Sequence, residues 1–136
     1  MIDIIREYME TCPYLDEFAT INVEYLVDKV NSYSVNEAAG YDPVIETYLD
    51  GSKEMIFKFN FDAKFYWNDE IQNNVDNSIF FENVRNWLEN NNDNNIFPDV
   101  DGIIPEEISA KTNGFIYITG ADEAIYRISC EFKYIK

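Results

Sequence analysis

An alternation of large apolar and polar side chains over residues 57–65 constrains the fold of this chain more than any other pattern. One set of alternate positions holds Phe57, Phe59, Phe61, Ala63 and Phe65, and the other holds Lys58, Asn60, Asp62 and Lys64. A period of two is the signature of a β-strand with one buried face. We therefore expect a sheet whose phenylalanine face lies on a core and whose other face meets water or a partner.

Two segments carry the three- and four-residue spacing of an amphipathic helix. In the first, the spacing of Ile2, Ile5, Met9 and Cys12 predicts a short helix that ends at Pro13. The second is predicted to run from about residue 71 to about Asn90. Its apolar stripe consists of Ile71, Val75, Ile79, Phe80, Val84, Trp87 and Leu88. This longer helix is the expected cover for the phenylalanine face.

Other alternating or β-branched segments predict the remaining strands, at residues 21–25, 32–36, 44–49, 108–119 and 124–136. Asp50-Gly51 predicts the hairpin turn before the phenylalanine strand. Periodicity is lost over residues 90–105, which we expect to form a mobile loop. The order α-β-β-β-β-α-β-β predicts one α+β domain over residues 1–136. Its sheet is expected to be antiparallel or mixed, with about six strands and both helices on one face.

The chain has no histidine and holds 26 acidic against 10 basic residues, for a formal net charge of −16. Without imidazole it lacks a side chain whose ordinary pKa is near neutrality, a histidine-activated nucleophile, and the preferred nitrogen ligand of zinc or copper. Because the basic residues are scattered singly, we expect no surface for nucleic-acid phosphates or anionic membranes. These features favour a binding or structural protein over an enzyme.

The two cysteines, Cys12 and Cys130, occupy apolar positions of the predicted first helix and last strand. We interpret both as small buried side chains rather than as a disulfide or a metal site. No run of eighteen apolar residues is present, and the N-terminus lacks the basic-then-apolar order of a signal peptide. We therefore expect a cytosolic chain without a membrane span.

Acidic side chains are the remaining candidates for chemistry. Asp93, Asp99 and Asp101 lie before Gly102 as in a calcium loop, but Phe97 and Ile108 stand where that loop needs oxygen ligands. The adjacent acids Asp16/Glu17, Glu106/Glu107 and Asp122/Glu123 are typical of solvated turns rather than of an acid–base pair. We predict no catalytic residue, no metal site and no cofactor.

Six residues are predicted instead to belong to an interface with a partner. They are Lys58, Asn60, Asp62 and Lys64 on the polar side of the phenylalanine strand, and Asp99 and Asp101 in the expected loop.

Several segments of the chain resemble a family of small tail proteins. They are TCPYLDEF at 11–18, INVEYL at 21–26 with SYSVNE at 32–37, YLDGS at 48–52, NVDNSIFFE at 74–82 with WLE at 87–89, and YRISCEF at 126–132. Proteins of this family are encoded by phages, prophages and contractile phage-tail-like bacteriocins (tailocins) of low-GC Gram-positive bacteria. They are often described as minor capsid or tail terminator proteins. The similarity spans nearly the whole chain, and its motifs are structural rather than catalytic.

The resemblance implies a tail terminator, a virion protein that forms a hexameric ring on the head-proximal end of a tail tube and stops its polymerisation. The implied partners are other copies of the chain, tube and sheath subunits, and a head–tail connector where a head exists. The resemblance also implies assembly in the host cytoplasm, followed by incorporation into the virion or bacteriocin particle.

An alternative from another class is an acidic DNA mimic that inhibits a basic nucleic-acid-binding protein. Such a mimic needs its carboxylates concentrated on one surface. Here Lys58, Lys64, Arg127 and Lys133 interrupt the polar faces of the two predicted long strands.

Overall fold

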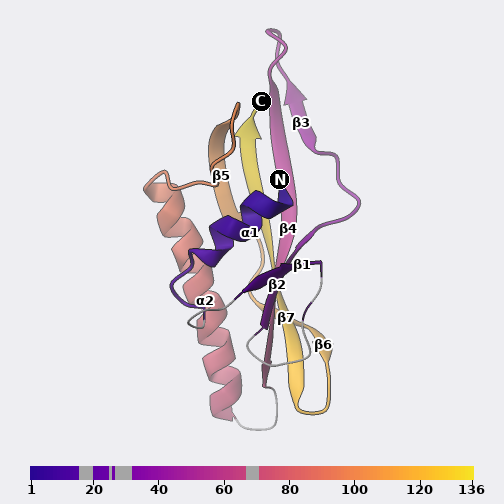
Figure 1. Ribbon diagram of the computed structural model, residues 1–136, viewed down its shortest axis with the longest axis vertical. Helices are drawn as coiled ribbons and strands as arrows, with labels where there is room; N and C mark the ends of the chain where they lie inside the picture. Colours follow the sequence, from indigo (N-terminus) through magenta and orange to yellow (C-terminus); the bar gives the residue numbers. More distant parts are fainter. Residues whose placement is uncertain (16–19, 25, 27–31, 67–70) are drawn as a thin grey trace.

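Two long antiparallel strands form the centre of the computed structural model, which describes residues 1–15, 20–24, 26, 32–66 and 71–136 (Figure 1). Within these ranges the chain has an α+β fold with two helices and a mixed, mostly antiparallel sheet of seven strands. The elements are α1 (Ile2–Glu10), β1 (Ile21–Val23), β2 (Ser32–Glu37), β3 (Val44–Thr47), β4 (Lys53–Tyr66), α2 (Ile71–Asp93), β5 (Ile104–Ala110), β6 (Phe115–Thr119) and β7 (Glu123–Ile135). The α+β class is confirmed, whereas the strand count and order differ in detail from the prediction.

Strands β4 and β7 pair over thirteen residues, from Glu54 opposite Ile135 to Tyr66 opposite Glu123. Residues directly opposite each other in such a pair project from the same face of the sheet. Phe59 therefore shares a face with Cys130, and Phe61 shares it with Ile128. All four of these side chains are buried, so the predicted alternation of the phenylalanine strand is confirmed.

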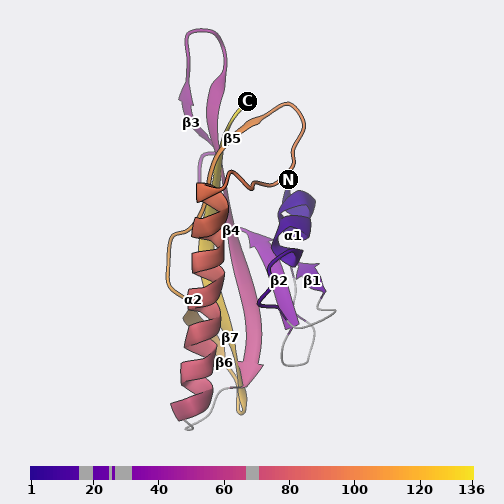
Figure 2. The same ribbon diagram turned by 90° about the vertical axis from the view of Figure 1, so that its left-hand side faces the viewer.

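Each long strand is flanked by two short strands that follow one another along its outer side. Strands β3 and β2 flank β4 at its first and second halves, and β6 and β5 flank β7 in the same way. Strand β1 pairs with β2 in the parallel direction, which makes the sheet mixed. The β3–β4 hairpin projects beyond the body of the molecule, at the end opposite to β6 (Figures 1 and 2).

Both helices pack on the phenylalanine face of the twisted sheet and contribute to one core. Ile5 and Met9 of α1 and Val84 and Leu88 of α2 are fully buried in the same cluster as the strand side chains. The helices also meet each other, because the rings of Tyr8 and Trp87 lie 5.4 Å apart between centroids. The longer helix, α2, thus packs on the phenylalanine face, as predicted.

The rotation of α2 about its axis differs from the predicted stripe. Val75 and Ile79 are 43% and 47% exposed, whereas Phe81 is buried and was not part of the stripe. Phe81 packs against Tyr126 of β7, with 5.5 Å between ring centroids. Because an aromatic ring buries more apolar area than Val or Ile, Phe81 and its aromatic neighbours decide which side of the helix faces the core. The prediction that Val75 and Ile79 belong to the core-facing stripe of this helix is therefore wrong.

The predicted loop over residues 90–105 is also wrong at both ends, since α2 continues to Asp93 and β5 starts at Ile104. Paired asparagine side chains explain the longer helix. Asn91 is buried and donates from Nδ2 to the Tyr8 hydroxyl at 2.8 Å. The Asn92 amide accepts from the Ile108 backbone N–H and donates to the Ile108 carbonyl oxygen. These amides make contacts inside the fold, where an asparagine-rich sequence suggested a break.

The strand predicted at 108–119 is two strands, β5 and β6, with an interruption at residues 111–114. At the interruption the backbone of Gly114 lies directly against the Phe81 ring, so that a Cβ atom there would overlap the ring. Glycine thus allows the chain to pass over α2 at this point. Of the predicted strand at 21–25, residues 21–23 form β1, and Tyr25 lies outside the described residues.

Cys12 and Cys130 are free and buried, as predicted. Burial raises the pKa of the Cys12 thiol to about 11 and that of the Cys130 thiol to about 12, so both stay protonated at neutral pH. Neither of the helices in the described ranges is long and apolar enough to cross a membrane.

Replacing Leu88 and Ile79 by alanine tests the orientation of α2. We expect Leu88→Ala to lower the free energy of unfolding by about 2–5 kcal/mol, because it leaves a cavity in the core. Ile79→Ala removes an exposed side chain and should change it by less than about 0.5 kcal/mol. Urea unfolding of both variants measures the difference, and equal losses would contradict the observed helix rotation.

Candidate interaction surface

The sheet face opposite the helices is here called the open face, because no helix of the described ranges covers it. It carries Lys58, Asn60, Asp62 and Lys64 of β4 beside Arg127, Ser129 and Glu131 of β7. The β4–β7 register places Lys58 opposite Glu131, Asn60 opposite Ser129, and Asp62 opposite Arg127. Lys58, Asn60 and Asp62 thus each meet a complementary partner directly across the strands, whereas Lys64 lies opposite Ile125.

A buried ion pair between Asp62 and Arg127 lies within the open face. Arg127 donates from Nε to Asp62 Oδ1 at 2.8 Å and from Nη2 to Oδ2 at 2.9 Å. Asn36 donates from Nδ2 to the same Oδ2 at 2.8 Å, and Asp62 is only 4% exposed. The Tyr117 ring covers the guanidinium at 3.7 Å from its centroid. Such a bidentate, ring-covered pair holds four elements of the sheet in one geometry.

The hydrogen bonds that Arg127 donates to Asp62 raise the pKa of the Arg127 guanidinium above its ordinary value, although its partial burial acts in the opposite direction. Arg127 therefore stays charged at neutral pH. The guanidinium thus acts as a fixed positive charge rather than as an acid or a base.

The rest of the open face is a ladder of weaker pairs. Lys58 Nζ lies 3.7 Å from Glu131 Oε1, and Lys64 Nζ lies 3.8 Å from Glu123 Oε1. The Ser129 hydroxyl donates to Asn60 Oδ1 at 2.9 Å. The four predicted interface residues of β4 are thus brought together, and each has a partner within the sheet. The open face consequently offers a shaped polar surface with its charges largely neutralised.

A shallow hollow of about 270 Å³ lies on the open face above the buried ion pair. It is lined by Glu24, Leu26, Ser34, Asn36, Asp62, Lys64, Tyr117, Ile125 and Arg127. Both oxygens of Asp62 already accept hydrogen bonds. The hollow therefore suits contact with another protein surface better than chemistry at a carboxylate.

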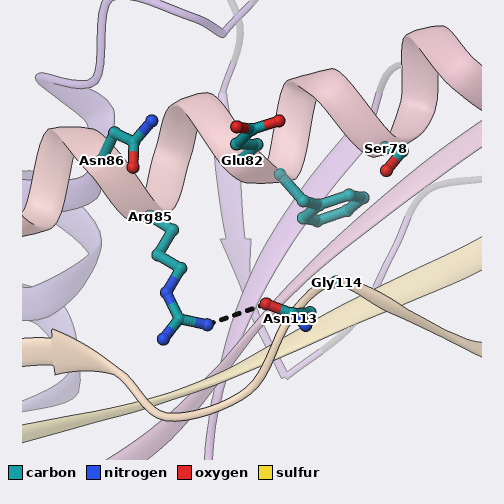
Figure 3. A pocket seen from close by; sticks show the side chains of 7 residues that line it. Ser78, Glu82, Arg85, Asn86, Asn113 and Gly114 are labelled. Atoms are coloured by element: carbon teal, nitrogen blue, oxygen red, sulfur yellow. Dashed lines mark hydrogen bonds between the residues drawn. The ribbon is translucent and has the colours of Figure 1, made fainter.

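A second hollow, of about 400 Å³, lies between α2 and the segment that joins β5 to β6 (Figure 3). Arg85 reaches across from α2 and donates from Nη1 to Asn113 Oδ1 at 2.8 Å. The Glu89 carboxylate lies 3.7 Å from Arg85 Nε. Arg85 thus joins α2 to the segment that precedes β6, and its charge is partly offset by Glu89 of the same helix.

The two other predicted interface residues, Asp99 and Asp101, lie away from the open face. Both are exposed in the segment before β5, and Asp99 lines a hollow beside Tyr8 and Thr11 of the α1 region. The structure therefore divides the six predicted residues between two surfaces. In the ranges that the structure describes, no three Cys, Asp or Glu side chains are placed to hold a metal ion.

Two exposed features were missed in the sequence. The first is β6, where Phe115, Ile116, Tyr117 and Ile118 are 41–51% exposed. The second is the β3–β4 hairpin, where Ile45 and Tyr48 are exposed and Leu49 at the turn is fully exposed. A signal for β6 is present in the sequence, because residues 112–121 form the longest stretch without a charge.

Acidic side chains gather at the base of the β3–β4 hairpin. Desolvation and the neighbouring Glu54 carboxylate raise the pKa of Glu106. Desolvation and then Glu54, Glu46 and Glu106 likewise raise the pKa of the Tyr48 hydroxyl. The hairpin therefore combines exposed apolar side chains with a negative local potential.

No family model matches this chain, and no curated protein is significantly similar to it in sequence.

The contribution of the buried ion pair can be measured with leucine substitutions. We expect Arg127→Leu to lower the free energy of unfolding by about 3–5 kcal/mol, because it leaves the Asp62 carboxylate buried without its cation. The double variant Asp62→Leu/Arg127→Leu should lose less than this single variant. Lys58→Leu, at the more exposed Lys58–Glu131 pair, is the matched control and should cost less than about 1 kcal/mol. A double variant that loses the sum of both single losses would contradict this account.

Proposed function

We propose that this chain is a structural tail-completion protein, a terminator that forms a ring on the head-proximal end of a phage-like tail tube. The family comes from the sequence resemblance described above. The observation that carries the proposal is that the sheet has two unlike free edges on opposite sides, β3 beyond β4 and β6 beyond β7. Both edges expose apolar side chains.

A subunit with two unlike edges is suited to a ring by symmetry. When one surface of a subunit binds a different surface of the next, the contact repeats head to tail and closes if the rotation divides a full turn. An unpaired strand edge supplies backbone N–H and C=O groups for such a contact. A ring formed in this way stops tube growth if one of its faces matches a tube subunit and the other does not.

The remaining partners follow from the same role. Tube subunits, sheath subunits in a contractile tail, and a head–tail connector in a complete phage would contact the two faces of the ring. The buried Asp62–Arg127 pair and its ladder support this role, because they hold the open face in one shape for a protein partner. The proposal assigns no catalytic residue and no cofactor.

The acidic DNA mimic has less support. Of the acids on the open face, Asp62 pairs with Arg127 and Glu131 lies near both Lys58 and Lys111. A phosphate mimic needs carboxylates that are available to a basic cleft, whereas these are already neutralised.

Deleting the gene in its phage or tailocin background tests the proposal. We expect tails of uncontrolled length, because nothing would stop tube polymerisation, and normal tails after complementation with the intact gene. Electron microscopy of negatively stained particles measures both, and labelled protein should appear at one end of the tube. Tails of normal length without the gene would contradict the proposal, and a stoichiometric complex with a basic nucleic-acid-binding protein would support the mimic.

A further inference from the structure

Strand β6 is an edge strand without the usual protection against pairing with another chain. Native edges are commonly blunted by charged side chains, prolines or covering groups. The four side chains Phe115 to Ile118 are apolar and about half exposed, and β6 pairs with β7 alone among the described strands. The strand therefore presents apolar side chains and a row of outward backbone groups together.

The neighbouring edges are protected. On β5, the Asn92 side chain hydrogen-bonds both the N–H and the carbonyl oxygen of Ile108. On β1, the backbone N–H of Ile21 donates to Glu10 Oε1 of α1 at 3.3 Å. On β3, the backbone N–H of Val44 donates to Asp42 Oδ1 at 3.0 Å, but no helix covers the strand among the described residues, and it belongs to the hairpin that projects from the body (Figure 2). The two open edges are thus β3 and β6.

Charge distinguishes these two edges and makes a contact between unlike edges more favourable than one between two acidic hairpins. Residues 112–121 hold no charged side chain. The cations around them, Lys111, Arg85 and Arg127, each lie against a carboxylate, so the surroundings of the strand are close to neutral. The projecting hairpin holds Glu46, Asp50 and Glu54 against the single cation Lys53. In a chain with a net charge of −16, an acidic hairpin meets less repulsion at the uncharged β6 edge than at an acidic surface.

We propose that β6 of one copy of the chain pairs with β3 of the hairpin of a second copy. The strands run antiparallel if the long strands of the two copies point the same way, because β6 runs in the direction of β4 and β3 runs against it. Each strand has one irregularity in its own register, between Val44 and Glu46 and between Ile116 and Ile118. The contact is therefore a short one of about four residues, matching the four of β3.

This contact joins unlike surfaces, so in a joined pair one copy keeps a free β3 and the other keeps a free β6 for the next copy. The inference deepens the proposed function and rests on it for ring closure, whereas the pairing of β3 with β6 stands on the two edges alone.

Three isoleucines of similar exposure allow the contact to be tested by cross-linking. Ile45 lies on β3, Ile118 on β6 and Ile79 on the outer side of α2, with exposures of 47%, 51% and 47%. Ile45→Cys and Ile118→Cys are mixed at high concentration and treated with a short bis-maleimide. The native Cys12 and Cys130 are buried and protonated, so they should not react.

We expect a covalent dimer from this mixture and none from either variant alone. Ile79→Cys mixed with either variant is the matched control and should give no dimer. The double variant Ile45→Cys/Ile118→Cys should give a ladder of oligomers that stops at the ring size. A dimer from Ile118→Cys alone would show that β6 pairs with itself, and no dimer from the mixture would show that β6 does not pair with β3. Either result overturns the inference.

A second pair of variants separates this contact from the proposed function. Ile118→Lys should weaken self-association at least about tenfold, because pairing would bury an ammonium group, and Ile79→Lys should leave it unchanged. If the cysteine variants cross-link but the deletion strain makes tails of normal length, the β3–β6 contact is supported and the terminator role is contradicted. If the deletion strain makes overlong tails but the cysteine variants do not cross-link, the terminator role is supported and the β3–β6 contact is contradicted.

Discussion

The antiparallel register of β4 and β7 is the constraint on which the rest of the structure depends. One face of this pair supplies the phenylalanine-rich core, and the other supplies the complementary partners of the open face. A shift by one residue would move every side chain of one strand to the other face. It would expose Phe59 and Phe61 and also separate Asp62 from Arg127. Core packing and the polar ladder thus select the same register.

The sequence predicts the parts of this fold in which a pattern repeats. The alternation over residues 57–65 and its counterpart in residues 124–136 predict both long strands and their buried faces. The register also has a sequence signal, since Lys58, Asn60 and Asp62 read against Glu131, Ser129 and Arg127 as complementary pairs. The sequence gives no signal for the contact of Tyr117 with Arg127 or for that of Asn36 with Asp62. Tyr117 and Asn36 belong to other strands, whose places in the sheet depend on tertiary packing.

The errors have specific physical causes. Helix α2 carries apolar side chains on more than one side, so spacing alone does not choose between Ile79 and Phe81, and ring packing against β7 decides it. The asparagine-rich segment after residue 90 was predicted to end the helix. Asn91 and Asn92 instead form hydrogen bonds with Tyr8 and Ile108, which are distant in sequence. Strand β6 was predicted as part of a longer strand, and its exposure follows from the turn at Gly114 over Phe81.

Some strand edges of this sheet are covered by side chains and others are open, and this difference links the fold to assembly of several copies. Asn92 and Glu10 cover two edges, while β3 and β6 stay open at opposite ends of the long strands. Backbone hydrogen exchange at low and high protein concentration tests this claim most directly. The account predicts slow exchange in β4 and β7 throughout, and exchange in residues 115–119 and 44–47 that is fast when dilute and slow when concentrated. Exchange in β6 that does not change with concentration would contradict it.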